Sequence, residues 1–185
     1  MVSIRRLIDI RTQESLGSKS TSLGGLLQIT LILAVATTAL IGPGAGMSLD
    51  QSIKQLPARR RIGVVAYSAY SRAGDQGNGL FLYPPIGIGT LLCALAAAIS
   101  GHLCRLPGTL QAPLDISAIL AILHSLVTAR AAPINLSQRK YEPTDEANLA
   151  RVLDRFEFWH NLRAVLQVLN FGAALWATIA LAGSR

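Results

Sequence analysis

Four long apolar runs constrain this 185-residue chain more than any other feature of its sequence. They cover about residues 23–46, 80–100, 113–132 and 163–183. Each is close to the roughly 20 residues that a helix needs to cross a hydrocarbon layer about 30 Å thick. Backbone amides in lipid must be hydrogen-bonded within the chain, and the runs lack the alternation of barrel strands, so each run predicts a transmembrane helix.

The predicted fold is therefore an all-α, integral membrane bundle of four transmembrane helices, a multi-pass protein whose main partner is the lipid bilayer. One membrane domain would cover residues 23–183, behind a basic tail over residues 1–22. Small residues recur within the second and fourth runs, including Gly87, Gly89 and Gly172. Because such residues let helices approach closely, they favour a packed bundle over four separate anchors.

Charge is sparse and unevenly placed. Charged residues make up 15% of the chain, and its formal net charge is +7. The Lys and Arg residues lie between the apolar runs, where they would face lipid headgroups, so we predict no nucleic-acid partner. The loops after the first and third runs carry more of them than the remaining segments, and the positive-inside rule then places these loops in the cytoplasm.

The two long loops are predicted to carry short interfacial amphipathic helices. In the first loop, one helix would end near Leu56 and a second would cover residues 58–73, with arginines at its start and apolar residues along one face. In the third loop, Thr144 would cap a helix that continues into the fourth run. Gly42-Pro43-Gly44 is predicted to end the first span, and Pro133 the third. Tyr83-Pro84-Pro85 and Ala112-Pro113 are predicted to open the second and third spans.

Motifs of soluble enzymes are absent from the sequence. It contains no P-loop, GxGxxG, HExxH or GxSxG pattern. The three histidines, His102, His124 and His160, are not spaced as metal ligands, and Cys93 and Cys104 form no CxxC pair. We therefore predict no metal and no cofactor.

Polar residues at the ends of the runs form three clusters. One is Glu157, Trp159, His160, Asn161 and Arg163, which enters the fourth run; a second is Arg130, Pro133 and Asn135; the third is Arg72, Asp75, Asn78 and Tyr83. A bundle of alternating direction brings all three clusters to one end, which predicts a site there. His160 could move protons there, and Arg163 could hold an anionic oxygen. Headgroup contacts, helix capping and a local Arg72–Asp75 ion pair are the structural alternatives.

One ionisable residue, His124, lies deep within the third run. Ionisable groups at such depth usually face the bundle interior and mark functional sites. A neutral imidazole that hydrogen-bonds a neighbouring helix is the alternative.

Several short motifs resemble the anthrone-oxygenase-like family of small four-helix membrane proteins. They are Leu56-Pro57-Ala58-Arg59-Arg60-Arg61-Ile62-Gly63, Tyr70-Ser71-Arg72-Ala73-Gly74-Asp75, Asn78-Gly79, Tyr83-Pro84, Pro133-Ile134-Asn135 and Trp159-His160-Asn161-Leu162-Arg163. The resemblance covers residues 23–183. It implies a monooxygenase of aromatic polyketide biosynthesis, which oxidises an anthrone to an anthraquinone with molecular oxygen and without a cofactor.

Such chemistry needs a base that forms the enolate and donors that stabilise its oxygen. The resemblance suggests His160 or His124 as the base and Asn135, Asn161 and Arg163 as donors. The substrate would lie against Arg72, Asn78, Tyr83 and Trp159. The alternative function is a non-catalytic membrane component that packs against partner membrane proteins or against further copies of itself.

Overall fold

The computed structural model describes the backbone of residues 2–184 and the side chains from Gly24 onward, and this part of the chain is helical without β-strands. Four helices are long and apolar enough to cross a membrane: Gly24–Ile62, Val64–Leu103, Gly108–Lys140 and Glu146–Gly183. The predicted all-α chain with four such helices is confirmed.

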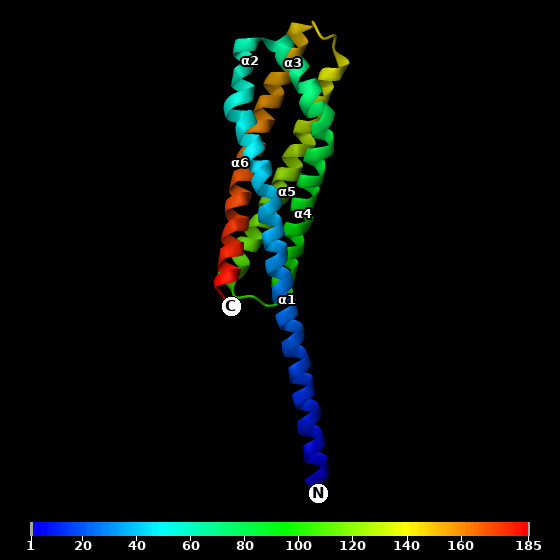
Figure 1. Ribbon diagram of the computed structural model, residues 1–185, viewed down its shortest axis with the longest axis vertical. Helices are drawn as coiled ribbons and strands as arrows, with labels where there is room; N and C mark the ends of the chain where they lie inside the picture. The colour runs from blue at the N-terminus through cyan, green and yellow to red at the C-terminus, as the bar shows by residue number, and fades with distance from the viewer. Residues whose placement is uncertain (1, 185) are drawn as a thin grey trace.

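The helices run alternately up and down (Figure 1). In chain order they are α1 (Val2–Asp50), the π-helical turn η1 (Gln51–Gln55), α2 (Leu56–Ile62), α3 (Val64–Ala73), the π-helical turn η2 (Gly74–Asn78), α4 (Gly79–Leu103), α5 (Gly108–Leu136), the 3₁₀ turn η3 (Ser137–Lys140) and α6 (Glu146–Gly183). Both termini lie at one end of the molecule, and α2 and α3 lie at the other. The first part of α1, which includes the predicted basic tail, extends beyond the bundle; its side chains are outside the described residues.

The helices are longer than their apolar runs. The 38 residues of α6 rise about 57 Å, nearly twice the thickness of a hydrocarbon layer. We call the apolar part (residues 24–46, 80–103, 108–132 and 163–183) the apolar bundle. The remainder at the α2–α3 end (residues 47–79 and 133–162) we call the head. The three polar clusters lie at the junction between these parts.

Small side chains fill the interior of the apolar bundle and large ones cover its outside. Its buried residues include Ala34, Ala97, Ala118, Ala121, Ala174 and Ala177. Large apolar side chains face outward, and Phe81, Leu126 and Ile179 are 84%, 60% and 63% exposed. This distribution is the reverse of that in a water-soluble core, and it is typical of helices that pack closely in a solvent as apolar as leucine.

The prediction that Gly42-Pro43-Gly44 ends the first helix is wrong, since α1 continues to Asp50. The two glycines are required by packing instead. A Cβ atom on Gly42 would lie 3.2 Å from Phe171 Cε2, and one on Gly44 would lie 3.2 Å from Gln167 Nε2. Both neighbours belong to α6, so the glycines bring α1 and α6 together.

Prolines also fail to mark the other predicted boundaries. Pro84 and Pro85 lie inside α4, and Pro113 and Pro133 lie inside α5, which continues to Leu136. Asp145, not Thr144, caps α6, because its carboxylate accepts a hydrogen bond from the Asn148 backbone N–H at 3.2 Å. Hydrogen bonds from Asn148 lower the pKa of Asp145. The continuous helix from the third loop into the fourth span is confirmed.

The helix predicted over residues 58–73 is broken into α2 and α3 at Gly63, whose φ is +86°. The break lets both helices pack on α6 around a cluster of Leu56, Tyr67, Ala131, Leu153 and Phe156. Arg59, which is buried, joins α2 to α6 by ion pairs with Asp154 (2.7 Å) and Glu157 (2.9 Å).

A Gly63→Ala substitution should destabilise the head, because Gly63 combines φ +86° with ψ +156°, a region almost restricted to glycine in which an L-residue costs about 1–3 kcal/mol. We expect the thermal unfolding midpoint in detergent to fall by a few degrees. Gly74→Ala is the matched control, since Gly74 has an ordinary φ of −84° and open space around its Cα. An equal effect of the two substitutions would contradict this explanation.

Candidate functional site

The buried face of α6 changes from apolar to polar at the junction. Leu149, Leu153 and Phe156 pack in the head, and His160, Gln167 and Asn170 follow at the same helical spacing. His160 and Asn170 are fully buried. Buried polar groups must be hydrogen-bonded, so the partners of these side chains show how α6 is joined to the neighbouring elements.

The first contact joins Arg163 and His160. Arg163 Nη2 lies 2.7 Å from His160 Nδ1, and His160 Nε2 lies 3.2 Å from the backbone oxygen of Ser48 in α1. A guanidinium can only donate and a carbonyl can only accept. The imidazole is therefore the neutral tautomer with its proton on Nε2, and both ring nitrogens are occupied.

Ser48 also contacts α6 through its side chain, because its hydroxyl donates to the side-chain oxygen of Gln167. Glu157, a member of the same polar cluster in the sequence, binds Arg59 and Arg60. Arg163 and Ser48 orient the imidazole.

A second group of contacts centres on Asp75 in η2. Its Oδ2 atom accepts hydrogen bonds from Gln51 Nε2 of η1 (3.0 Å) and from Ser71 Oγ of α3 (3.2 Å). The two π-helical turns therefore meet through Gln51 and Asp75, and the chain kinks beside them at Gly77. Such π-helical insertions occur frequently at functional sites.

The predicted Arg72–Asp75 ion pair does not form. Arg72 points away from Asp75, and its Nη2 donates to the backbone oxygens of Gln138 and Tyr141. Arg72 also lines a groove of about 440 Å³ on the outer side of α3, together with Val65, Ser68, Ala69, Ala73 and Pro143.

Asn135 belongs to a third group of contacts, next to Asp75. Its side-chain oxygen accepts from Gln138 Nε2 (2.6 Å) and from Ser71 Oγ (3.5 Å), and its backbone oxygen accepts from Gln76 Nε2 (2.8 Å). Gln138 is fully buried and also accepts from the Ser68 hydroxyl at 2.8 Å. Asn135 thus helps to hold α3, η2 and η3 together, and Ser71 connects it to Asp75.

Other predicted site residues make no hydrogen bond within these groups. Asn161, Asn78 and Arg130 are exposed. Trp159 packs against the apolar cluster of the head. Tyr83 is 43% exposed, and its phenol lies beside the Asp75 carboxyl.

His124 lies deeper, within the apolar bundle, and is buried. Its Nε2 atom is 3.3 Å from the Thr128 hydroxyl of the same helix. One turn or more further into the bundle, Ser117 of α5 donates to Asn170 of α6 at 2.7 Å. These contacts place polar groups between α5 and α6 without connecting them to Asn135.

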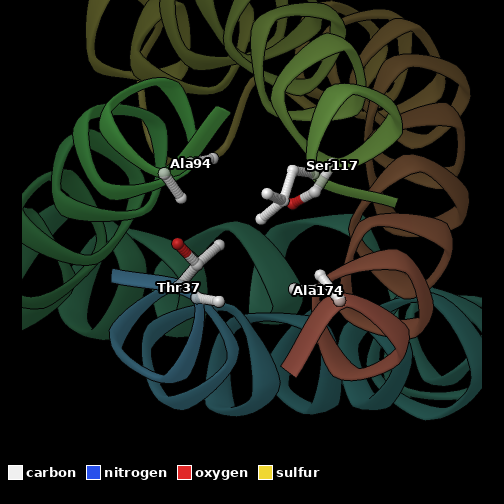
Figure 2. A pocket seen from close by; sticks show the side chains of 8 residues that line it. Thr37, Ala94, Ser117 and Ala174 are labelled. Atoms are coloured by element: carbon white, nitrogen blue, oxygen red, sulfur yellow. The ribbon is translucent and has the colours of Figure 1, made fainter. Parts of the chain in front are cut away.

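The centre of the apolar bundle holds a cavity of only about 10 Å³. Figure 2 shows that Thr37, Ala94, Ser117 and Ala174, from four different helices, face this cavity. A single water needs about 10–15 Å³, so the centre has no room for an organic ligand.

Arg163 is the most unusual group at the junction. Its side chain is half-buried, its Nε atom is buried without a hydrogen-bond partner, and its Nη2 contacts only a neutral imidazole. Asp75 and Tyr83 lie near enough to interact with its charge. Among the side chains that the structure describes, however, no carboxylate pairs directly with it. A guanidinium so placed has unused capacity to bind an anionic oxygen.

Among the described side chains, those of residues 24–184, no group of three His, Cys, Asp or Glu residues lies close enough together to hold a metal ion. Comparison with protein-family models, curated proteins and solved structures found no match for this chain. The resemblance to the anthrone-oxygenase-like family therefore stays a prediction.

Sequence reasoning identified His160, Arg163 and Asn135 but not the importance of Asp75, Gln51 and Gln138. Asp75 had one available signal: it lies four residues after Ser71, so the two share a helix face. The contact of Gln51 with Asp75 joins separate helical segments and has no such local signal.

Replacing Gln138 with Leu should destabilise the head, because Ser68 and Asn135 would lose a buried partner. A buried polar group left unpaired costs about 1–3 kcal/mol, so the thermal unfolding midpoint in detergent should fall clearly. Gln28→Leu makes the same chemical change at an exposed position and should have little effect. A stable Gln138→Leu variant would show that the network does not hold the head.

Proposed function

We propose that this chain is an integral, multi-pass membrane protein whose apolar bundle crosses a bilayer. Four helices of sufficient length and hydropathy support this proposal, as does their outer surface of large apolar side chains. Contiguous apolar surface of this extent is unfavourable in water.

The protein should therefore stay in the membrane pellet after an alkaline carbonate wash and enter solution only with detergent. The test is immunoblotting of the two fractions from cells that express the full chain. Release by carbonate alone would contradict membrane integration.

We further propose that the junction binds a lipophilic aromatic molecule through an acidic oxygen and oxidises it with molecular oxygen, as a cofactor-free anthrone oxygenase would. The observation that carries this proposal is Arg163, a half-buried cation with a neutral partner and an unused buried N–H. An enolate oxygen supplies the anionic acceptor that Arg163 lacks, and such stabilisation is most effective in a site of low dielectric constant.

The reaction balances without a further reductant or oxidant. A proton leaves the CH₂ carbon of the anthrone, and the resulting enolate transfers an electron to O₂. Recombination of the two radicals forms a C–O bond, which gives a hydroperoxide after protonation. Loss of water leaves a ketone at the former CH₂ carbon, so one oxygen atom enters the anthraquinone and the other leaves as water.

The substrate would bind at the junction and not in the bundle centre. Pockets for molecules of drug-like size measure about 300–1,000 Å³, whereas the central cavity measures about 10 Å³. Beside Asp75, all residues of Leu80–Pro85 are exposed. This stretch exceeds one helical turn, so the described helices leave α4 uncovered there and a lipophilic molecule can approach Tyr83 from the bilayer.

A non-catalytic membrane component is the second candidate. The closely packed centre favours it, because a bundle whose interior is filled by alanine serves assembly without any ligand. Stoichiometric co-purification with a defined membrane complex, together with no catalysed oxygen uptake, would support this function.

The deciding experiment is oxygen uptake by the detergent-purified protein with emodin anthrone. We expect quinone formation above the spontaneous rate and a loss of about 100-fold or more in Arg163→Gln, as for removal of one oxyanion donor. Arg130→Gln is the matched control, because it makes the same chemical change at an exposed arginine.

A further variant, Ala69→Trp, fills the groove on the outer side of α3 and should leave the rate unchanged. Loss of activity in Ala69→Trp alone would move the substrate site to that groove. Absence of any rate above the spontaneous one in the unaltered protein would refute the oxygenase function.

A further inference from the structure

The proposed oxygenation needs a base, and the geometry of His160 does not supply one. Its Nδ1 lone pair accepts from Arg163, and its Nε2 proton is donated to the Ser48 carbonyl. To accept a substrate proton, His160 would have to release the contact that holds Arg163 in place. His124 lies near enough to Arg163 to interact with its charge, but it is enclosed between helices within the apolar bundle, and its Nε2 atom lies against the Thr128 hydroxyl.

Resting on the proposed function, we propose that Asp75 is the catalytic base, which removes the proton from the substrate carbon beside Arg163. It would be a further catalytic residue at the junction, in addition to the polar residues of α6.

The fixed position of the Asp75 carboxylate is the first argument. Donors from two separate elements, Gln51 in η1 and Ser71 in α3, both bind Oδ2. One oxygen is thus anchored, and the side chain is held in a single orientation. A catalytic base is effective only when its geometry relative to the substrate is fixed in this way.

The charges around Asp75 are arranged so that the carboxylate and a nearby cation stay separate. The side chain is half-buried, and Arg163 and Tyr83 lie near enough to interact with it. In a direct ion pair, Arg163 and Asp75 would neutralise each other. The carboxylate would then be a weaker base, and the guanidinium would be less able to bind the enolate oxygen. The separated arrangement leaves the cation for the developing enolate oxygen and the carboxylate for the proton.

Asp75 can be reached by a substrate from the side of the bundle. Asp75 precedes the exposed stretch Leu80–Pro85 by one to two turns, and Tyr83 of that stretch lies beside the carboxyl. A substrate that reaches Tyr83 from the bilayer is therefore next to the Asp75 carboxyl.

Asp75 both accepts the substrate proton and returns it later in the same turnover. The carboxylate takes the proton from the CH₂ carbon and becomes a carboxylic acid while the enolate forms against Arg163. After the reaction with O₂, the same carboxylic acid returns the proton to the peroxide anion. Loss of water then leaves Asp75 ionised for the next turnover.

The test compares Asp75→Asn and Asp75→Ala with the unaltered full-length protein in detergent. General-base catalysis contributes about 10²–10⁴-fold, so Asp75→Asn should lose at least 100-fold in kcat. The variant should still bind the product emodin with near-normal affinity, measured by the absorbance change of the quinone. Added formate should restore part of the activity of Asp75→Ala in proportion to its concentration, because a small carboxylate can occupy the vacated space.

Asp154→Asn is the matched control, since the Asp154 side chain is 69% exposed and binds Arg59 in the head. It should retain full activity and show no response to formate. Thermal unfolding in detergent checks that each variant folds.

Each outcome separates the two proposals. If the unaltered protein is inactive, the oxygenase function is wrong and the role of Asp75 falls with it. If the unaltered protein is active and Asp75→Asn keeps its rate, only the role of Asp75 is wrong. Loss of product binding together with activity, without rescue by formate, would make Asp75 a structural residue and overturn its assignment as the base.

Discussion

Close contact between helix faces made of alanine, glycine and threonine is the constraint on which the rest of this structure depends. A Cβ atom on Gly42 or Gly44 would lie only 3.2 Å from a side chain of α6, and the bundle centre is lined by Ala94, Ala174 and Thr37. In the bilayer proposed for this bundle, dispersion contacts and close backbone approach would hold such helices together, because burial of apolar surface gives no driving force in an apolar solvent. The same closeness removes any interior pocket, so a ligand site is only compatible with the ends or the sides of the bundle.

The polar residues obey a second constraint, which is that each must find a partner inside a poorly hydrated bundle. His160 meets this requirement through Arg163 and Ser48, and Asp75 meets it through Gln51 and Ser71. Arg163 does not meet it fully, since its Nε has no partner. Natural structures keep such incompletely satisfied groups mainly where function requires them. The junction is for this reason the part of the molecule where chemistry is best supported, and the two π-helical turns lie beside it.

Sequence reasoning was accurate where a signal is local and periodic. The four apolar runs predicted four long helices, and their alternating direction predicted that Asn135, His160 and Arg163 would reach the same end. Proline and glycine were misread as helix ends. In water a proline inside a helix costs a hydrogen bond, whereas in these long apolar helices neighbouring groups compensate for the loss and the glycines serve interhelical packing. The Arg72–Asp75 pair that the sequence offered as a structural alternative does not form, because the backbone oxygens of Gln138 and Tyr141 bind the guanidinium.

The sequence by itself determined the all-helical class, the four long apolar helices and the end of the bundle at which polar residues gather. These properties follow from the length and apolar character of each run, which a chain cannot change by folding. Only the tertiary structure decided which side chains pair, that both nitrogens of His160 are occupied and that Asp75 of η2 binds Gln51 of η1 near Arg163. Those properties depend on the rotation and vertical offset of each helix, which are set by side-chain contacts between segments far apart in the chain.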